Sequence, residues 1–247
     1  MSDILQTSLP YDPNRPRPLP GIAGFDMLDW LHVDEVYAGQ MAERARLLSE
    51  HRGDVLALDD GAVDAAQELL ETVLDLAYVG ARDVVMRPDG VQVAVDRADP
   101  LGTLGHLVQE DLCILQKHGD EHVLTGAMLC FPASWTLAEK FMRPLIGIHD
   151  TVDDYDSGVA KRVQRLFDGV QVGRPLWRFN ALWYADAKLH QPHSVHDRRV
   201  QIDEAAAQYL RSERQCILRL PKTRAVVFSI HTYVVSRANL KGISPNP

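Results

Sequence analysis

Cysteine is scarce in this sequence, and a long apolar run is absent. The three cysteines, Cys113, Cys130 and Cys216, cannot all pair within one chain, and none lies in a CxxC or other metal-ligand spacing. We therefore expect reduced thiols, each buried on a strand, in a cytoplasmic protein. No stretch approaches the roughly 20 apolar residues of a membrane-spanning helix, and the first residues lack the pattern of a secretory signal, so we expect neither membrane insertion nor secretion.

Positive charge is in deficit. Lysine and arginine number 26 against 34 aspartates and glutamates, which gives a formal net charge of −8. A protein that binds the nucleic-acid backbone needs a surplus of clustered lysine and arginine, so this balance argues against that class.

Several catalytic and metal-binding motifs are missing as well. The sequence holds no GxSxG elbow, Walker loop or GxGxxG, so acyl transfer, nucleotide hydrolysis and dinucleotide binding lack motif support. Its 10 histidines form no HExxH and no Cys/His quartet, and Pro192 interrupts the polar segment that carries His190, His193 and His196. A structural zinc site is therefore disfavoured.

Length and composition fit one globular domain. A chain of 247 residues with 46% hydrophobic and 24% charged residues is ordinary for a folded domain. Residues 10–21 contain five prolines, which favour an extended arm on the surface of the fold. We therefore divide the chain into a proline-rich arm at residues 1–21 and a single domain at residues 22–247.

Hydrophobic periodicity predicts helices and strand pairs. Apolar residues recur at helical spacing in residues 33–51, 62–79, 136–149 and 157–168. Alternating patterns predict strands at residues 91–96, 111–117, 122–131, 178–185, 209–220 and 225–235. Hairpin pairs without a regular β-α-β alternation favour a mainly antiparallel sheet with helices packed on it, which is an α+β fold.

The strand predicted at residues 209–220 is unusually polar. Because side chains alternate along a strand, Arg211, Glu213 and Gln215 share one face, while Arg214 and Cys216 share the other. One interpretation is a strand that lines a cavity, where an arginine pairs with a ligand carboxylate. The other is a solvated face with ordinary ion pairs, and the residues alone favour neither.

Other polar residues lie beside predicted strands. Arg178 and Asn180 are two residues apart on one strand face, next to Trp177, and these aromatic and polar groups frame a flat ligand or pack in the core. Glu110 belongs to an acidic pair at the start of a strand, where it captures an amine cation or caps the strand end. The second interpretation of Glu110 is the favoured one.

His149 stands apart from the other histidines because it follows the apolar run FMRPLIGI and precedes the acidic loop DTVDDYD. Haem needs a nitrogen donor within an apolar slot, so an imidazole at a helix end is a candidate axial ligand. From spacing alone, a hydrogen-bonded core histidine is the favoured interpretation.

Several segments, taken together and in order, resemble one known family. They are QEDLCIL at 109–115, CFPASW at 130–135, EKFMRPLIGIHDTV at 139–152, RFN at 178–180, YLRSERQCILRLP at 209–221 and AVVFSIHTYVV at 225–235. The series resembles the haem-dependent oxidative N-demethylase family, haem-binding (alpha) subunit type. Fungal relatives in that family are named for an HRQ motif, which here reads Glu213-Arg214-Gln215. The resemblance covers most of the chain.

This resemblance implies a PAS-like fold that binds haem b and uses O₂ to demethylate a small secondary amine such as dimethylamine. Such a protein is a monooxygenase-type oxidoreductase that releases formaldehyde, and its cofactor carries the difficult chemistry. His149 is implied as the axial ligand of the haem iron. The residues implied to contact haem or to line the pocket are Arg178, Asn180, Glu213, Arg214, Gln215 and Glu110.

The resemblance also implies a partner, because the sequence has no flavin or iron–sulfur motif. We expect electrons from a separate flavin or iron–sulfur reductase protein. Two positions depart from the family pattern: Ala181 follows Asn180 where the family often has Trp, and Asp153 follows Val152 where it tends to have a Val-Pro turn. The amine is therefore not fixed by the resemblance. The alternative function is a haem or small-ligand sensor module without turnover, since a fold does not determine a function.

Overall fold

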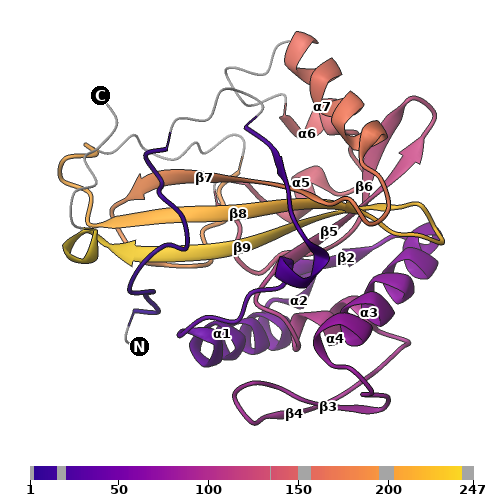
Figure 1. Ribbon diagram of the computed structural model, residues 1–247, viewed down its shortest axis with the longest axis horizontal. Helices are drawn as coiled ribbons and strands as arrows, with labels where there is room; N and C mark the ends of the chain where they lie inside the picture. The colour runs from indigo at the N-terminus through magenta and orange to yellow at the C-terminus, as the bar shows by residue number, and fades with distance from the viewer. Residues whose placement is uncertain (1–2, 16–20, 134, 150–156, 195–202, 241–247) are drawn as a thin grey trace.

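The computed structural model describes residues 3–15, 21–133, 135–149, 157–194 and 203–240, with side chains throughout except at residues 149 and 157–161. Within these residues the fold is built on a seven-stranded sheet, in the order β1-β7-β8-β9-β5-β6-β2, whose paired strands are all antiparallel (Figure 1). The strands are β1 (Ala23–Gly24), β2 (Leu56–Leu58), β5 (Asp111–His118), β6 (Glu121–Met128), β7 (Leu176–Tyr184), β8 (Tyr209–Arg219) and β9 (Val226–Ser236). A separate hairpin pairs β3 (Val84–Met86) with β4 (Gln92–Ala94).

The predicted hairpins are confirmed. Strands β5 and β6 pair from Leu112 with Met128 to His118 with Glu121, and β8 and β9 pair along their whole lengths. Strand β9 occupies the middle of the sheet because it also pairs with β5. The α+β class with a mainly antiparallel sheet is therefore confirmed.

Helices cover both faces of this sheet. The long helices are α1 (Tyr37–Glu50), α3 (Val63–Ala77) and α7 (Ser157–Gly169), and the short ones are α2 (Arg52–Val55), α4 (Pro100–Gly105), α5 (Leu137–Lys140) and α6 (Leu145–His149). Single 3-10 turns lie at Met27–Asp29, Asp60–Ala62 and Arg237–Asn239. Figure 1 shows α1, α3 and α4 on one side of the sheet and α6 and α7 on the other.

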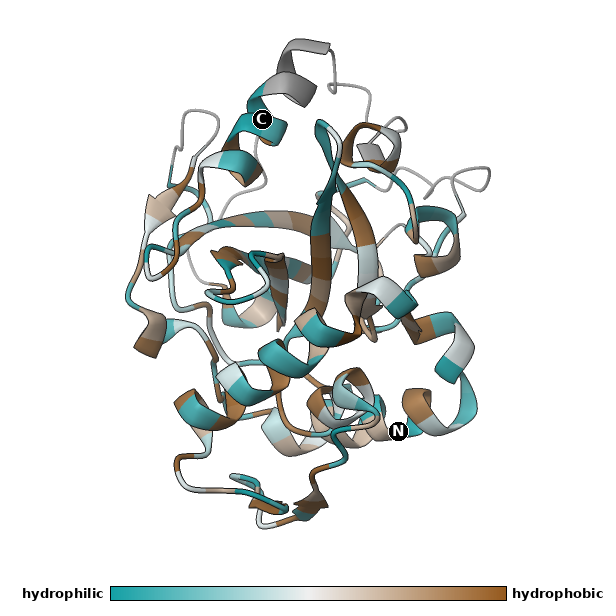
Figure 2. Cartoon of the chain, turned by 90° about the vertical axis from the view of Figure 1, so that its right-hand side faces the viewer, coloured by the Kyte–Doolittle hydropathy of each residue, from teal (hydrophilic) through white to brown (hydrophobic). Residues whose placement is uncertain are grey.

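Each face of the sheet has its own hydrophobic core. On the first face, Leu69 of α3 and Leu104 of α4 belong to a buried cluster with Ile114 of β5. On the second face, Leu145 of α6 and Phe167 of α7 belong to a cluster with the sheet residues Leu124, Ile217 and Ile230. Polar residues, teal in Figure 2, are frequent on the helix surfaces turned toward the viewer, as amphipathic helices require.

The single helix predicted at residues 136–149 is wrong. The chain forms α5 and α6 there, separated by residues 141–144, and Met142 has a φ of 58° in the left-handed region. Pro144 explains the break, because a proline has no N–H to donate and its ring disfavours a helical conformation at the residue before it. The break gives α6 a direction of its own, and α6 packs against β6 and α7.

The three cysteines are free and buried, as predicted. Cys113 and Cys216 lie on β5 and β8, whereas Cys130 lies just beyond the end of β6 rather than on a strand. No helix in the described part of the chain is both long enough and apolar enough to cross a bilayer.

The described N-terminal residues lie along the sheet. The backbone N–H of Gln6 donates to the carbonyl of Val234 over 2.9 Å, and the Tyr11 ring stacks on Phe179 with centroids 4.3 Å apart. Residues 16–20 of the predicted proline-rich arm lie outside the described residues, so the arm and its boundary at residue 21 stay predictions.

A buried ion pair ties α1 to the start of β5. Arg44 and Asp111 are both inaccessible to solvent, and Arg44 Nη2 lies 2.9 Å from Asp111 Oδ1. The same carboxylate accepts hydrogen bonds from the backbone N–H groups of Cys130 and Phe131, at 2.8 and 2.9 Å. Asp111 therefore holds a helix and the end of β6 in place through one side chain.

Replacement of this carboxylate should be strongly destabilising. In an Asp111→Ala variant, Arg44 keeps a buried charge without its partner and two amides lose their acceptor, so we expect a loss of about 3–5 kcal/mol in the free energy of unfolding. Urea denaturation followed by circular dichroism measures it. Arg97→Ala, which breaks an exposed pair with Glu71, is the control and should leave the midpoint nearly unchanged. Equal midpoints for the two variants would contradict the role of Asp111.

Candidate functional site

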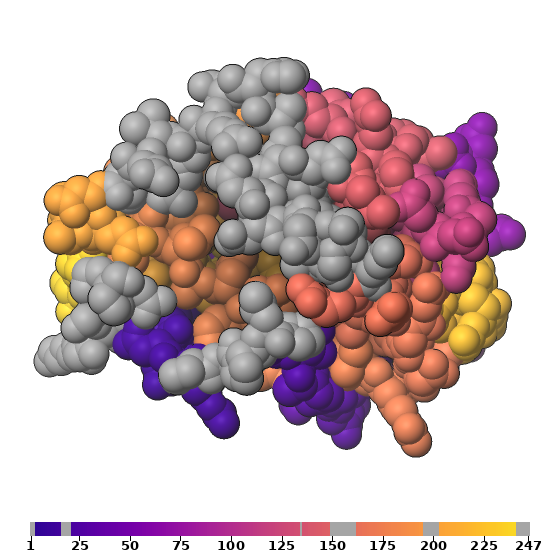
Figure 3. Space-filling model, turned by 90° about the horizontal axis from the view of Figure 1, so that it is seen from above, coloured from indigo at the N-terminus to yellow at the C-terminus, as the bar shows by residue number. Residues whose placement is uncertain are grey.

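A cavity of about 540 Å³ lies between the second face of the sheet and helices α5 to α7. Figure 3 looks onto this side of the molecule, where pink residues of the 125–150 region lie beside orange residues of the 160–185 region. The apolar wall of the cavity is formed by residues of the sheet, of α6 and α7, and of the N-terminal segment: Ile22, Leu115, Leu124, Leu145, Ile148, Val163, Leu166, Phe167, Ile217, Phe228 and Ile230. A largely apolar cavity of this size with few polar groups is typical of a small-molecule or cofactor site.

Glu213 is the carboxylate in the cavity wall, and its neighbours hold it in one position. Its Oε2 accepts hydrogen bonds from Asn180 Nδ2 and Gln215 Nε2, each at 3.1 Å. Arg211 Nε lies 3.7 Å from the other oxygen, Oε1, close enough for an ion pair but too far for a hydrogen bond. Among the described residues, Oε1 accepts no hydrogen bond, so it can receive an N–H from a ligand.

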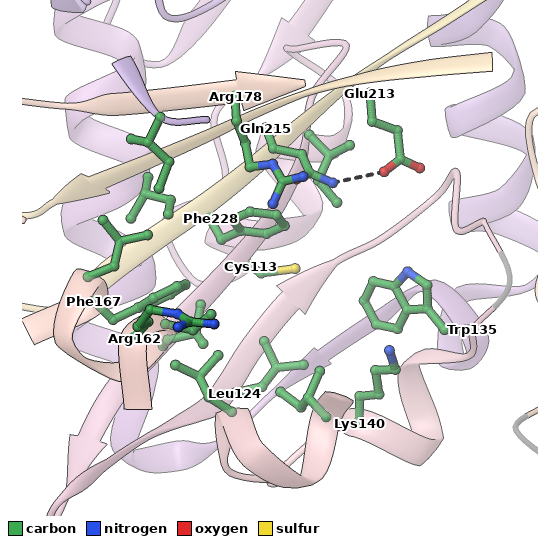
Figure 4. Close-up of a pocket in the computed structure, with 18 residues that line it drawn as sticks. Cys113, Leu124, Trp135, Lys140, Arg162, Phe167, Arg178, Glu213, Gln215 and Phe228 are labelled. Carbon is green, nitrogen blue, oxygen red and sulfur yellow. Dashed lines mark hydrogen bonds between the residues drawn. The ribbon is translucent and has the colours of Figure 1, made fainter. Parts of the chain in front are cut away.

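Arg178 and Gln215 reach the cavity from neighbouring strands. They are directly paired across β7 and β8, and Figure 4 shows both side chains projecting from the sheet, with Phe228 nearby. The planar guanidinium of an arginine suits bidentate binding of a carboxylate, so this wall can hold an anionic group of a ligand.

Lys140 and Trp135 form the facing wall. Lys140 Nζ lies 4.6 Å from the centroid of the Trp135 ring, in cation–π contact, and both residues line the cavity (Figure 4). Burial lowers the pKa of Lys140 to about 8, and the nearby charge of Glu139 offsets only part of this effect. The ammonium form is therefore retained at neutral pH.

Cys113 contributes a neutral thiol to the cavity. Burial, with the nearby charge of Asp111, raises the pKa of Cys113 to about 12. Because only a thiolate binds a metal or attacks an electrophile, Cys113 acts here as an apolar part of the wall.

The sequence-predicted pocket residues fall on two faces of the sheet. Arg178, Glu213 and Gln215 line the cavity. Asn180 is not part of the lining, but it donates a hydrogen bond to Glu213. Arg214, the middle residue of the Glu213-Arg214-Gln215 motif, is directed to the opposite face, as alternation along β8 requires. There its guanidinium donates to the carbonyls of Trp30 at 2.9 Å and Asp29 at 2.7 Å.

Glu110 also lies away from the cavity, in a buried polar cluster on the first face. Its Oε1 lies 2.9 Å from His231 Nδ1, and it accepts a hydrogen bond from the backbone N–H of His32 at 2.9 Å. Asp34 Oδ2 lies 3.3 Å from the other ring nitrogen of His231, and the Tyr233 hydroxyl is 2.6 Å from His32 Nδ1. These contacts join the loop before α1, and the residue before β5, to β9.

The two histidines of this cluster experience opposite electrostatic effects. Burial lowers the pKa of His231, but hydrogen bonds and charge from Asp34 and Glu110 outweigh it and raise the pKa above 6.5. Burial, with the positive charges of Arg214 and His231, lowers the pKa of His32 to about 4. The surroundings of His231 therefore favour its imidazolium form, whereas His32 is a neutral imidazole at neutral pH.

His149 is the last residue of α6, and its side chain lies outside the described residues. Its helix borders the cavity, because Leu145 and Ile148 both line it. The assignment of His149 as an iron ligand stays a prediction.

Sequence reasoning missed Trp135, Lys140 and Arg162 as cavity residues. Two of them lie within the recognised segments CFPASW and EKFMRPLIGIHDTV, and that position was the available signal. Their position in the cavity wall has no local sequence signal, because it depends on how α5 and α7 pack over the sheet.

Comparison with models of known protein families identifies the family of this chain. Residues 21–245 match the family described as haem-dependent oxidative N-demethylase, alpha subunit-like. The matched residues include both walls of the cavity. They also include the buried polar cluster around Glu110 and His231 on the first face.

The opposite shifts of the two histidines give a titration test. We expect His32 to titrate near pH 4 and His231 to titrate above the usual range of a histidine, in nuclear magnetic resonance of ring-labelled histidine. His32→Gln and His231→Gln variants assign the two signals. The stability contributed by His231 is present below pH 6.5 and is lost as pH rises through its folded pKa, whereas His32 makes stability fall as pH drops from 6.5 toward 4. A His32 signal that titrates near 6.5 would contradict this assignment.

Proposed function

Because the chain belongs to the haem-dependent oxidative N-demethylase, alpha subunit-like family, we propose that it binds haem b in the cavity beneath α5 to α7 and supports oxidative demethylation of a secondary amine. The observation that carries this proposal is the coincidence of the family match with an apolar cavity lined by Arg178, Glu213 and Gln215. A PAS-like fold is part of the proposal.

The residues of the cavity fit a haem group. A volume of about 540 Å³ lies within the range of about 300–1,000 Å³ that is usual for ligand pockets. Apolar side chains such as Phe167 and Phe228 suit a porphyrin face, and Arg178 suits a propionate carboxylate.

We assign the axial position to His149. Support comes from α6, which ends at this residue and whose Leu145 and Ile148 line the cavity. Imidazole is a common axial ligand of haem iron, and an apolar surround controls access of solvent to it.

The chain's own residues would bind and orient the amine. When bound, haem supplies the activation of O₂, which no amino-acid side chain provides. Glu213 Oε1 accepts an N–H of the amine, while Asn180 and Gln215 hold Oε2 and so fix the direction of the carboxylate. The apolar wall excludes water from the reacting methyl group.

The overall reaction requires an electron donor. A secondary N-methylamine, O₂, two electrons and two protons give the primary amine, formaldehyde and water. We propose that a separate flavin or iron–sulfur reductase protein supplies the electrons, and the description of the family as an alpha subunit supports a partner chain.

Loss of the proposed iron ligand should change the haem spectrum. Purified protein reconstituted with haem should show a Soret band that shifts with dithionite and carbon monoxide. His149→Ala should shift or abolish that band while circular dichroism stays unchanged, and His118→Ala, at the exposed end of β5, is the control. An identical spectrum for His149→Ala would rule out this ligand, and no Soret band in the unaltered protein would rule out the haem site.

Removal of the Glu213 charge should weaken amine binding without loss of haem. A hydrogen bond from an ammonium to a carboxylate contributes about 1.5–3 kcal/mol, so we expect Glu213→Gln to raise the KM for the amine roughly tenfold to hundredfold. The assay measures formaldehyde released with O₂ and a reductant, and Glu204→Gln on the exposed surface is the control. Haem binding without formaldehyde release from any N-methylamine would indicate a haem-binding module without turnover.

A further inference from the structure

Besides Arg178 and Arg162, the cavity contains a third cation, Lys140, that neither the proposed amine contact nor the proposed propionate contact uses. Lys140 extends from the end of α5, and its ammonium contacts the ring of Trp135 at the cavity wall. Among the described residues, no carboxylate lies within ion-pairing distance of Lys140 Nζ. The nearest acidic neighbour in sequence, Glu139, is hydrogen-bonded instead to Thr136 at 2.9 Å and Ser194 at 2.6 Å.

An ammonium in this position gains from an anionic ligand. Lys140 is half-buried and has no ion pair among the described residues, so its charged form lacks full solvation and full pairing, and burial lowers its pKa to about 8. Buried charges in proteins are normally paired, and a carboxylate beside Lys140 would restore that pairing. A positively charged amine placed near Lys140 would instead be repelled.

Glu213 and Lys140 stand on different walls of the same cavity. Glu213 projects from β8 on the sheet side, whereas Lys140 and Trp135 belong to the α5 region that covers the sheet (Figure 4). The two side chains make no ion pair with each other, although their charges are opposite. A ligand that carries both an ammonium and a carboxylate would satisfy both walls, whereas a simple dialkylamine would satisfy only Glu213.

We propose that the substrate is an amine that also carries a carboxylate, as N-methylated amino acids do, with its nitrogen at Glu213 and its carboxylate at Lys140. This inference rests on the proposed function and narrows its substrate class. The reaction then converts an N-methyl amino acid, O₂, two electrons and two protons into the amino acid, formaldehyde and water, and the separate reductase protein supplies the electrons. The N–CH₃ bond breaks, and the methyl carbon is oxidised.

A carboxylate at Lys140 has two sources, the substrate and a haem propionate. The test therefore compares ligands that differ only in that group. N-Methylglycine and its primary amide form one matched pair, and N-methylleucine and its primary amide form a larger pair. Calorimetric titration of the purified full-length protein, with and without haem, measures the dissociation constant of each.

The expected result is a preference for the acids that depends on residue 140. The unaltered protein should bind at least one acid roughly tenfold to hundredfold more tightly than its amide, as a charge-assisted hydrogen bond predicts. Lys140→Arg should keep this preference, and Lys140→Met should lose it while binding of the amide and of haem stays the same. Lys188→Met, at an exposed site outside the cavity lining, should behave as the unaltered protein.

The pH dependence provides a second readout. Because the carboxylate is bound by the protonated ammonium, the affinity for the acid, whose own amine stays protonated, should fall as pH rises through about 8. Lys140→Met should not show this fall, whereas a merely structural Lys140 would give the same pH profile for the acid in both proteins.

Three results would overturn the inference. Equal binding of acid and amide in both pairs would exclude a carboxylate site. A Lys140→Met variant with weaker haem binding but an unchanged acid preference would assign Lys140 to a propionate. Faster formaldehyde release from dimethylamine than from both acids would leave the proposed function standing and reject this substrate class. Failure of the proposed function is recognised separately, by the absence of a Soret band.

Discussion

Strand β8 places alternate side chains in two different environments, the cavity on one face of the sheet and the hydrophobic core on the other. The arrangement of both faces depends on this alternation. Glu213 and Gln215 are directed to the cavity, and Arg214 and Cys216 are directed to the opposite core, because successive side chains of a strand point to opposite faces. Each face satisfies its polar groups separately: Asn180 and Gln215 hold Glu213, and backbone carbonyls hold Arg214. A shift of one residue in pairing would exchange the two sets and place an arginine and a carboxylate among unsuitable partners.

Much of the fold could be predicted from the sequence because its main elements have local signals. The alternation in residues 111–131 and 209–235 gave both hairpins, and the apolar stripe of α3 gave a helix within a few residues of its bounds. The break between α5 and α6 was missed because the apolar spacing continues across it, although Pro144 and its effect on Arg143 were visible in the sequence. Strands as short as β1 and β2 carry no period of their own, and only tertiary pairing defines them.

The candidate site was predictable to the extent that it lies on paired strands. Arg178 and Asn180 on β7 and Glu213 and Gln215 on β8 come together because each pair is two residues apart and the strands are adjacent. Arg214 was grouped with them through the motif, although its position between Glu213 and Gln215 already indicated the other face. Lys140 and Trp135 lie in the layer that covers the sheet, so no local pattern could place them opposite Glu213.

The order of strands in the sheet has a consequence for synthesis of the chain. Strand β9 is made after the other six strands of the large sheet, yet it lies at the centre, between β5 and β8. Until it leaves the ribosome, the β5-β6-β2 half and the β1-β7-β8 half have no strand to join them, and each half exposes an unpaired edge. The large sheet therefore cannot be completed until the last of its strands has been made, and its central pairings are all long-range or late in the chain.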